Sequence, residues 1–106
     1  MSYEPIIKDS VAGTALLVRA GKIEVDAVEA INTTAAAAYL QLFDAATAAS
    51  VTPGTTLPVF VLKSAANDPS AYKLGGWVFQ LGVVVASTTT VIGATGATQH
   101  VRLGVR

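Results

Sequence analysis

The sequence predicts an all-β protein, a single β-sandwich or jelly-roll-like domain of about seven or eight short antiparallel strands. Three observations predict this fold class. Several segments alternate polar and apolar residues, as half-buried strands do. Clusters of Gly, Pro, Asn and Thr separate these segments at intervals of roughly ten residues. The 106 residues contain no sustained heptad, fixed repeat or long linker, so they form one domain.

The N-terminal residues are the least regular part of the pattern. Residues 1–13 mix Pro, Asp, Ser and Gly with few apolar positions. We therefore expect an extended N-terminal arm or a first edge strand over 1–13, and the β-sandwich domain over 14–106.

The next segments carry a clear strand pattern. Leu16-Leu17-Val18 predicts a short strand, and Ala20-Gly21 predicts the turn after it. Residues 22–27 alternate strictly between polar and apolar types, which predicts a half-buried strand. Val28 then follows an alanine directly, so the phase changes and we expect a bulge or bend near 27–28.

Residues 35–49 fit two kinds of secondary structure. A helix is favoured by a run of alanines and by apolar side chains spaced as i, i+3, i+4 and i+7, namely Tyr39, Leu42, Phe43 and Ala46. A strand would instead send Tyr39, Gln41 and Phe43 to one face. Because strand-patterned segments lie on both sides, we predict a strand over 37–45, and the sandwich depends on this assignment.

Residues 52–63 predict a turn followed by an edge strand. The turn is Thr52-Pro53-Gly54-Thr55-Thr56, with Pro at a corner and Gly able to adopt positive φ. Residues 57–63 alternate again, but Pro58 has no backbone donor, which places this strand at a sheet edge. Such an edge is a natural point for strand addition between chains.

The remaining segments complete the predicted sandwich. In chain order we expect a loop at 66–70, a short strand at 72–74 ending at Gly75-Gly76, a strand at 77–86 bent at Gly82, a turn at 87–90, a short strand at 91–92, a loop at 93–97 and a closing strand at 100–106. The 77–86 segment is nearly all apolar, which predicts a strand that is covered on both faces.

The composition is unusually apolar for a chain of this size. Hydrophobic residues make up 52% and charged residues 13%, whereas an ordinary soluble domain is about a quarter charged. So few charges cannot cover a small monomer, and we expect more apolar surface to be buried against partners, above all copies of the chain itself. The longest apolar run is shorter than the roughly 20 residues of a spanning helix, so no membrane partner is expected.

The charge and the N-terminal residues restrict the classes of partner and the cellular compartment that we expect. The net charge is zero, so we expect no binding to nucleic acid. Acidic residues concentrate in residues 1–50 and basic residues in 51–106. Opposite charges on the two halves would help copies of the chain associate in a fixed register. A solvated surface explains the same pattern without any such role. The chain has no cysteine and its N-terminal residues lack signal-peptide features, so we expect folding in a cytoplasm. Asn32-Thr33-Thr34 matches a glycosylation sequon, but we expect a turn there.

No combination of residues predicts catalysis, a cofactor or a metal. His100 is the only histidine, so a metal site would need copies around a three-fold axis, and we expect an exposed strand residue instead. Glu24 and Asp26 lie two residues apart, as acid–base or calcium-binding carboxylates can, but alternation beside Lys22 favours a solvated sheet face. Ser, His and Asp all occur without a nucleophile elbow. We therefore expect no enzyme activity and no catalytic, cofactor-binding or metal-binding residues.

Two further motifs are better assigned structural roles. Gly93-Ala-Thr-Gly96 lacks the Lys-Ser/Thr ending of a phosphate-binding loop, so we expect a flexible loop. Aromatic residues could form a platform for sugars or bases, namely Tyr39, Phe43, Trp77 and Phe79. Basic residues are not interleaved with them, which favours the core or a subunit interface.

Several motifs together resemble a known group of proteins. They are Asn32 followed by Ala38-Tyr39-Leu40-Gln41-Leu42-Phe43-Asp44, then Thr52-Pro53-Gly54-Thr55, Leu57-Pro58-Val59, Gly75-Gly76-Trp77-Val78-Phe79, Gly82-Val83 and Ser87-Thr88-Thr89. Over roughly residues 16–106 the chain is similar to small structural proteins of tailed-bacteriophage virions, described as head decoration, cement or head-fibre proteins.

The resemblance implies a β-sandwich that forms homotrimers at three-fold positions of the capsid and contacts the major capsid protein. Such a protein is made in the bacterial host cytoplasm and resides on the capsid surface of the virion. Its function would be decoration or cement, because many copies bridge neighbouring subunits and their summed binding resists internal pressure. The N-terminal arm, which lies outside the similarity, would reach across neighbouring capsid subunits.

Two other functions stay open at this point. One is a receptor- or glycan-binding fibre or tail domain with an exposed aromatic such as Tyr72 or Trp77 in a groove. The other is a polysaccharide hydrolase built around Glu24 and Asp26.

Overall fold

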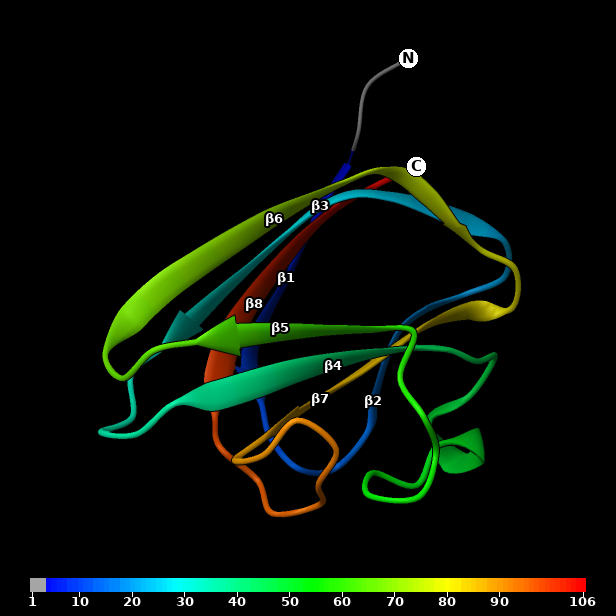
Figure 1. Ribbon diagram of the computed structural model, residues 1–106. Helices are drawn as coiled ribbons and strands as arrows, with labels where there is room; N and C mark the ends of the chain where they lie inside the picture. The colour runs from blue at the N-terminus through cyan, green and yellow to red at the C-terminus, as the bar shows by residue number, and fades with distance from the viewer. Residues whose placement is uncertain (1–3) are drawn as a thin grey trace.

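The computed structural model describes residues 4–106, apart from the side chain of Asp9, and contains two four-stranded antiparallel sheets (Figure 1). The first sheet has the order β1-β8-β3-β6, formed by Glu4–Val11, Gln99–Val105, Ile23–Asn32 and Asp68–Phe79. The second sheet has the order β2-β7-β4-β5, formed by Leu16–Ala20, Gly82–Thr88, Ala38–Asp44 and Phe60–Ser64. The predicted all-β sandwich is confirmed, with eight strands in the described residues.

The main core lies between the two sheets. Its large buried side chains include Ile23, Val25, Leu40, Leu42, Phe79 and Leu103. A second, smaller cluster lies on the outer face of the second sheet, where Phe43 and Val84 pack with Ala45 and Val51 from the segment after β4. This segment contains the short 3-10 helix Ala48–Ser50. Both faces of β7 are therefore covered, and all of its residues are buried.

The ambiguous segment after Asn32 forms strand β4, as predicted, rather than a helix. Leu40 and Leu42 point into the main core, whereas Phe43 joins the second cluster on the opposite face. Burial on both faces leaves no polar stripe. For this reason the local pattern fits a helix and a strand equally well, and tertiary packing decides between them.

The predicted phase change in the long strand is a β-bulge. The register of β3 shifts between Val25 and Ala27 against both of its neighbours. As a result Ile23 and Val25 before the bulge, and Val28 and Ala30 after it, are all buried in the core. Here the sequence alone located the irregularity.

The predicted single strand over 77–86 is wrong. Strand β6 ends at Phe79, Gln80 and Leu81 form a turn, and β7 starts at Gly82. The Asp44 carboxylate fixes this turn by accepting the backbone N–H groups of Gln80 at 3.0 Å and Leu81 at 2.8 Å. Gly82 has φ +146°, and a Cβ there would lie 2.7 Å from a backbone carbonyl oxygen of Ala45. The hairpin thus depends on contacts from distant segments.

Other element boundaries also differ from the predictions. β6 includes part of the predicted loop 66–70 and continues through Gly75 and Gly76, whose positive φ angles of 67° and 83° accommodate an irregularity without ending the strand. β5 lies at a sheet edge as predicted but starts at Phe60 rather than 57. Val91-Ile92 is a turn rather than a strand.

The N-terminal segment supplies an edge strand of the first sheet. β1 pairs with β8 from Glu4 opposite Val105 to Val11 opposite Gln99. The sandwich therefore begins within the segment where an arm or edge strand was expected.

Asn32 ties the first sheet to the second. Its side chain is 1% exposed. Its amide nitrogen donates to the carbonyl oxygens of Ala36 at 2.8 Å and Ala65 at 3.0 Å, and its oxygen accepts the backbone N–H of Thr34 at 2.9 Å. The residue closes an Asx turn between β3 and β4 and holds it against the end of β5. Its amide is fully engaged, so the sequon at 32–34 is a structural turn.

Candidate interaction surface

Each open side of the sandwich is crossed by one short connection between the sheets and is bounded by an edge strand of each sheet. On the side of the edge strands β1 and β2, residues 12–15 connect the two sheets, and Arg19 of β2 forms an ion pair with Glu4 of β1 at 3.1 Å. On the side of β5 and β6, each sheet ends in an edge strand with one row of unpaired backbone groups. Residues 65–67 connect the two sheets on this side, so the two sides differ in their exposed side chains rather than in how open they are.

Apolar side chains are concentrated along the β5/β6 side. Among the described residues, six of the ten exposed large apolar side chains lie on these strands or next to their ends: Leu57, Val59, Val61, Tyr72, Trp77 and Leu81. We call this set the apolar strip. Tyr72 and Trp77 are 58% and 50% exposed. Exposed apolar side chains gathered on one side of a soluble protein indicate an interaction site.

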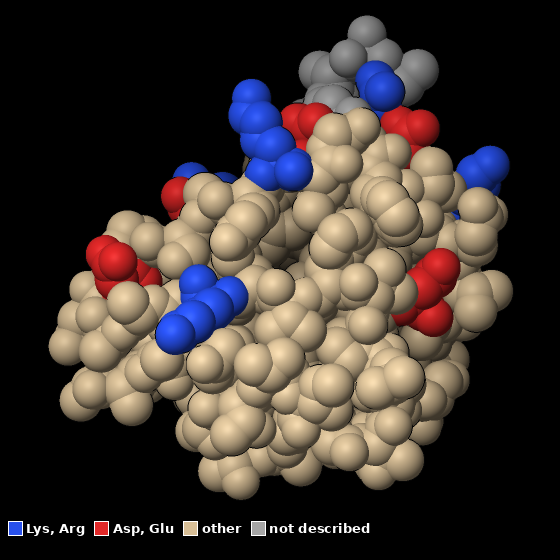
Figure 2. All heavy atoms as spheres, in the orientation of Figure 1, with Lys and Arg blue, Asp and Glu red and all other residues tan. Residues whose placement is uncertain are grey.

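Two hollows lie along the apolar strip. The first has a volume of about 310 Å³ between β5 and β6, where Tyr72, Leu74 and Val61 lie around buried Val28 and Leu42. In Figure 2 the surface is hollowed between the levels of β6 and β5. The second has a volume of about 280 Å³ and lies between Leu57, Val59 and Leu81. Both hollows could accept apolar side chains of a partner.

The aromatic residues of the strip are held in place. The rings of Trp77 and Phe60 meet edge to face, with centroids 5.0 Å apart and an interplanar angle of 85°. This contact joins the two sheets across the open side and fixes the exposed indole. Lys73 lines the first hollow, and Lys63 lies with its Nζ 6.0 Å from the centroid of Tyr39. The strip therefore has a positive charge on each of its two strands.

Three loops that meet at one end of the sandwich carry no charged residue. No Asp, Glu, Lys or Arg occurs in residues 12–15, 45–62 or 74–101. The loops 12–15, 52–56 and 89–97 meet at this end, since a Cβ on Gly13 would lie 2.8 Å from Gly96 and one on Gly54 would lie 3.3 Å from Ala94. We call these three loops the uncharged end. In Figure 2 the lower part of the molecule, over β7 and these loops, shows neither acidic nor basic side chains.

Internal hydrogen bonds hold the loops of the uncharged end. Thr89 donates its backbone N–H to Thr95 at 2.9 Å, and Thr56 donates to Thr52 at 2.8 Å. Gln41, which is buried on β4, donates its amide to the Thr88 hydroxyl at 2.7 Å and to the Gly93 carbonyl at 3.3 Å. The loop predicted to be flexible at 93–97 is thus fixed by backbone and side-chain contacts.

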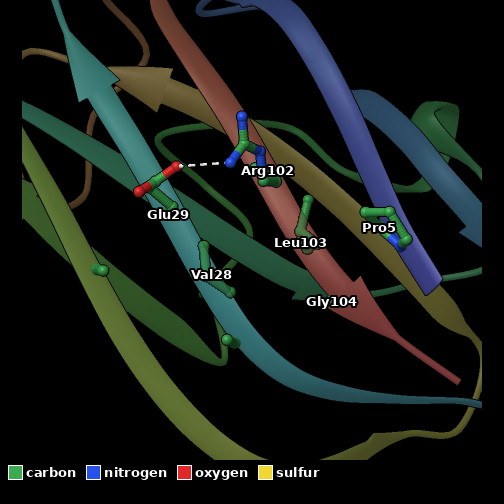
Figure 3. Close-up of a pocket in the computed structure, with 8 residues that line it drawn as sticks. Pro5, Val28, Glu29, Arg102, Leu103 and Gly104 are labelled. Carbon is green, nitrogen blue, oxygen red and sulfur yellow. Dashed lines mark ion pairs between the residues drawn. The ribbon is translucent and has the colours of Figure 1, made fainter. Parts of the chain in front are cut away.

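The outer face of the first sheet carries a third hollow, of about 340 Å³ (Figure 3). Its floor consists of small residues of four strands, including Pro5, Ala27, Ala71 and Gly104. An exposed ion pair between Arg102 and Glu29 at 3.6 Å crosses it. The hollow is shallow, and its polar groups are already paired with each other.

The structure does not assemble the predicted chemical candidates into a site. Glu24 forms an ion pair with Arg106 at 2.6 Å, and Asp26 lies at the bulge. His100 is exposed on β8, and Phe43 and Phe79 are core residues. Over residues 4–106 no group of three or more His, Cys, Asp or Glu side chains is placed to hold a metal ion.

Sequence reasoning missed the long-range hydrogen bonds of the residues that position the surface. Asp44, Gln41 and Asn32 fix loops by hydrogen bonds that span long sequence distances. The uncharged end did have a signal, because two long stretches without Asp, Glu, Lys or Arg are visible in the chain.

Comparisons with family models, with curated proteins and with solved structures found no match to this chain. In the described part of the chain, no helix has the length and apolar character needed to cross a membrane.

Proposed function

We propose that the protein is a structural component of a tailed-bacteriophage virion, a capsid decoration or cement protein that binds and stabilises the shell as an oligomer. Its partners are copies of itself, most simply in a homotrimer, and the major capsid protein. It is made in the bacterial host cytoplasm and resides on the capsid surface, and it performs no catalysis. The observation that carries this proposal is the apolar strip.

The strip suits a protein that works by binding. Its half-exposed side chains lie beside hollows and edge strands, which provide apolar contacts and backbone hydrogen bonds to one partner. A specific interface of about 800 Å² per partner is sufficient for stable association. Many copies acting on one shell would sum modest individual contributions into a large resistance to internal pressure.

The proposal is tested by co-sedimentation with capsid shells of the phage that encodes the protein. We expect the protein to bind expanded shells and not unexpanded procapsids. Tyr72→Glu places a charge in the strip, and we expect it to weaken shell binding at least about tenfold, which corresponds to about 1.4 kcal/mol. Ile7→Glu is the matched control, because Ile7 is an exposed apolar residue on the opposite edge strand of the same sheet. A wild-type protein that binds neither kind of shell would rule the proposal out.

A glycan-binding fibre domain is the second candidate. It is favoured by the exposed Tyr72 ring beside a hollow and by the fixed Trp77 indole. Sugar recognition also needs polar side chains around the ring. Besides the tyrosine itself, Lys73 is the only polar side chain among the described residues that line this hollow. A glycan array that shows a ligand for the wild type and none for Tyr72→Ala would favour this function over the first.

A further inference from the structure

We infer that the uncharged end is the surface through which copies of this chain contact one another around a symmetry axis. The inference deepens the proposed function, because it assigns the oligomer that this function requires to a particular surface. The occupant of the surface is a second copy of the chain, and the contact is made by the loops 12–15, 52–56 and 89–97.

The charge distribution decides which surface meets its own copy. Near a symmetry axis each side chain lies close to the same side chain of the neighbouring copy, so a charged residue there meets a like charge. The apolar strip carries Lys63 on one strand and Lys73 on the other, so a symmetry axis that passes beside either lysine would bring like charges together. The uncharged end carries no such group and complements itself.

The loops at this end are suited to burial. Some of their backbone groups are paired within the chain, as in the Thr89–Thr95 and Thr56–Thr52 hydrogen bonds. Polar groups that are already paired lose little when water is removed. The glycine contact between Gly13 and Gly96 also fixes the loops before association, which lowers the entropy cost of binding.

An apolar pair lies at the tip of the longest of these loops. Val91 and Ile92 are 50% and 49% exposed in a turn whose other residues are mainly Thr, Gly and Ala. The main core and the second cluster contain neither residue. Burial of this pair against its counterpart would provide the apolar centre of the contact, with threonine hydroxyl groups around it.

The test measures mass by light scattering and sedimentation, without any shell present. We expect the wild type to be oligomeric at micromolar concentration and to remain so from about 0.05 M to about 1 M NaCl, because no charge pair holds the contact. Val91→Glu and Val91→Lys should each yield monomers by like-charge repulsion. An equimolar mixture of the two should recover oligomers, since opposite charges then meet at the axis.

Two controls distinguish this contact from association through the apolar strip and from misfolding. Tyr72→Glu lies in the apolar strip, so its mass should equal that of the wild type even where its shell binding is lost. Circular dichroism checks that each variant folds, and Thr14→Glu on the neighbouring loop replaces Val91→Glu if the latter does not fold.

Several outcomes would overturn the inference. They are a monomeric wild type, a Val91→Glu protein with wild-type mass, a mixture that stays monomeric, and dissociation by Tyr72→Glu in place of Val91→Glu. None of these measurements involves a shell. A protein that assembles in this way and yet binds no shell would therefore contradict the proposed function alone.

Discussion

The two ends of the sandwich differ in where their polar and charged groups lie. At the end where Glu4 and the C-terminus lie (Figure 1), the interior is apolar, with Ile23, Val25 and Phe79 buried, and the exterior carries charges. Arg19–Glu4 and Arg106–Glu24 form ion pairs on this exterior. At the uncharged end the exterior has no charge, and the polar groups are inside.

Five of the six buried polar residues in the described chain lie at or next to strand ends on this side of the sandwich, and the sixth, Gln41, lies in the middle of β4 and bonds to Thr88 and Gly93. The six residues are Asn32, Gln41, Ser64, Ser87, Thr88 and Gln99. Exposed ion pairs contribute little to stability, whereas a buried hydrogen-bonded group is costly to disrupt. The uncharged end should therefore be the more sensitive to mutation, although its exterior has no chemistry.

The largest effect should come from Asn32→Ala. This change removes the donor to Ala36, Ser64 and Ala65 and leaves those carbonyl groups without a side-chain partner. We expect the free energy of unfolding to fall by about 3 kcal/mol, measured by urea denaturation. Thr34→Ala, which removes only a part-buried hydroxyl of the same turn, should cost less than about 1 kcal/mol. Equal losses in the two variants would show that Asn32 is not the tie between the sheets.

Gly96→Ala should have the next largest effect. A Cβ on this residue would lie 2.7 Å from the Gly13 nitrogen, so the two loops must separate. We expect a loss of about 1–3 kcal/mol in thermal unfolding experiments. The exposed Thr95→Ala in the same loop should stay within about 0.5 kcal/mol of the wild type. A Gly96→Ala protein as stable as Thr95→Ala would contradict the close loop contact.

Much of the fold could be predicted from local patterns. The bulge in β3 followed from two adjacent apolar residues, and the closing strand β8 followed from alternation, because one face of each strand is buried and the other is solvated. β4 was identified only from its context, since both of its faces are covered.

What could not be predicted depends on contacts between distant segments. The β6–β7 turn contains no strong turn sequence at Gln80-Leu81, and its position is set by Asp44, which comes more than thirty residues earlier. The apolar strip was likewise only partly visible. Tyr72 and Trp77 were recognised as possible exposed aromatics, but the structure was needed to bring Leu57 and Leu81 to one hollow.

Asp44→Ala tests whether a carboxylate can matter more as a hydrogen-bond acceptor than as a member of an ion pair. It removes the acceptor for the N–H groups of Gln80 and Leu81. Because these hydrogen bonds are solvent-exposed, water replaces part of the loss, and we expect about 1 kcal/mol in urea denaturation. Asp44→Asn keeps one acceptor oxygen and should lose about half as much. A full loss in the Asn variant would indicate that charge, rather than acceptance, is the source of stability.

The smallest effect should come from the ion pair between Arg19 and Glu4. The two side chains are 40% and 66% exposed, so water screens their attraction. In a double-mutant cycle with Arg19→Met and Glu4→Gln, we expect a coupling energy below about 1 kcal/mol, which falls toward zero in about 1 M NaCl. A coupling that exceeds this value and persists in salt would mean that the charged end is held by its ion pairs as firmly as the uncharged end is held by its buried hydrogen bonds. The contrast between the two ends would then be one of surface composition only, with no difference in how each end is stabilised.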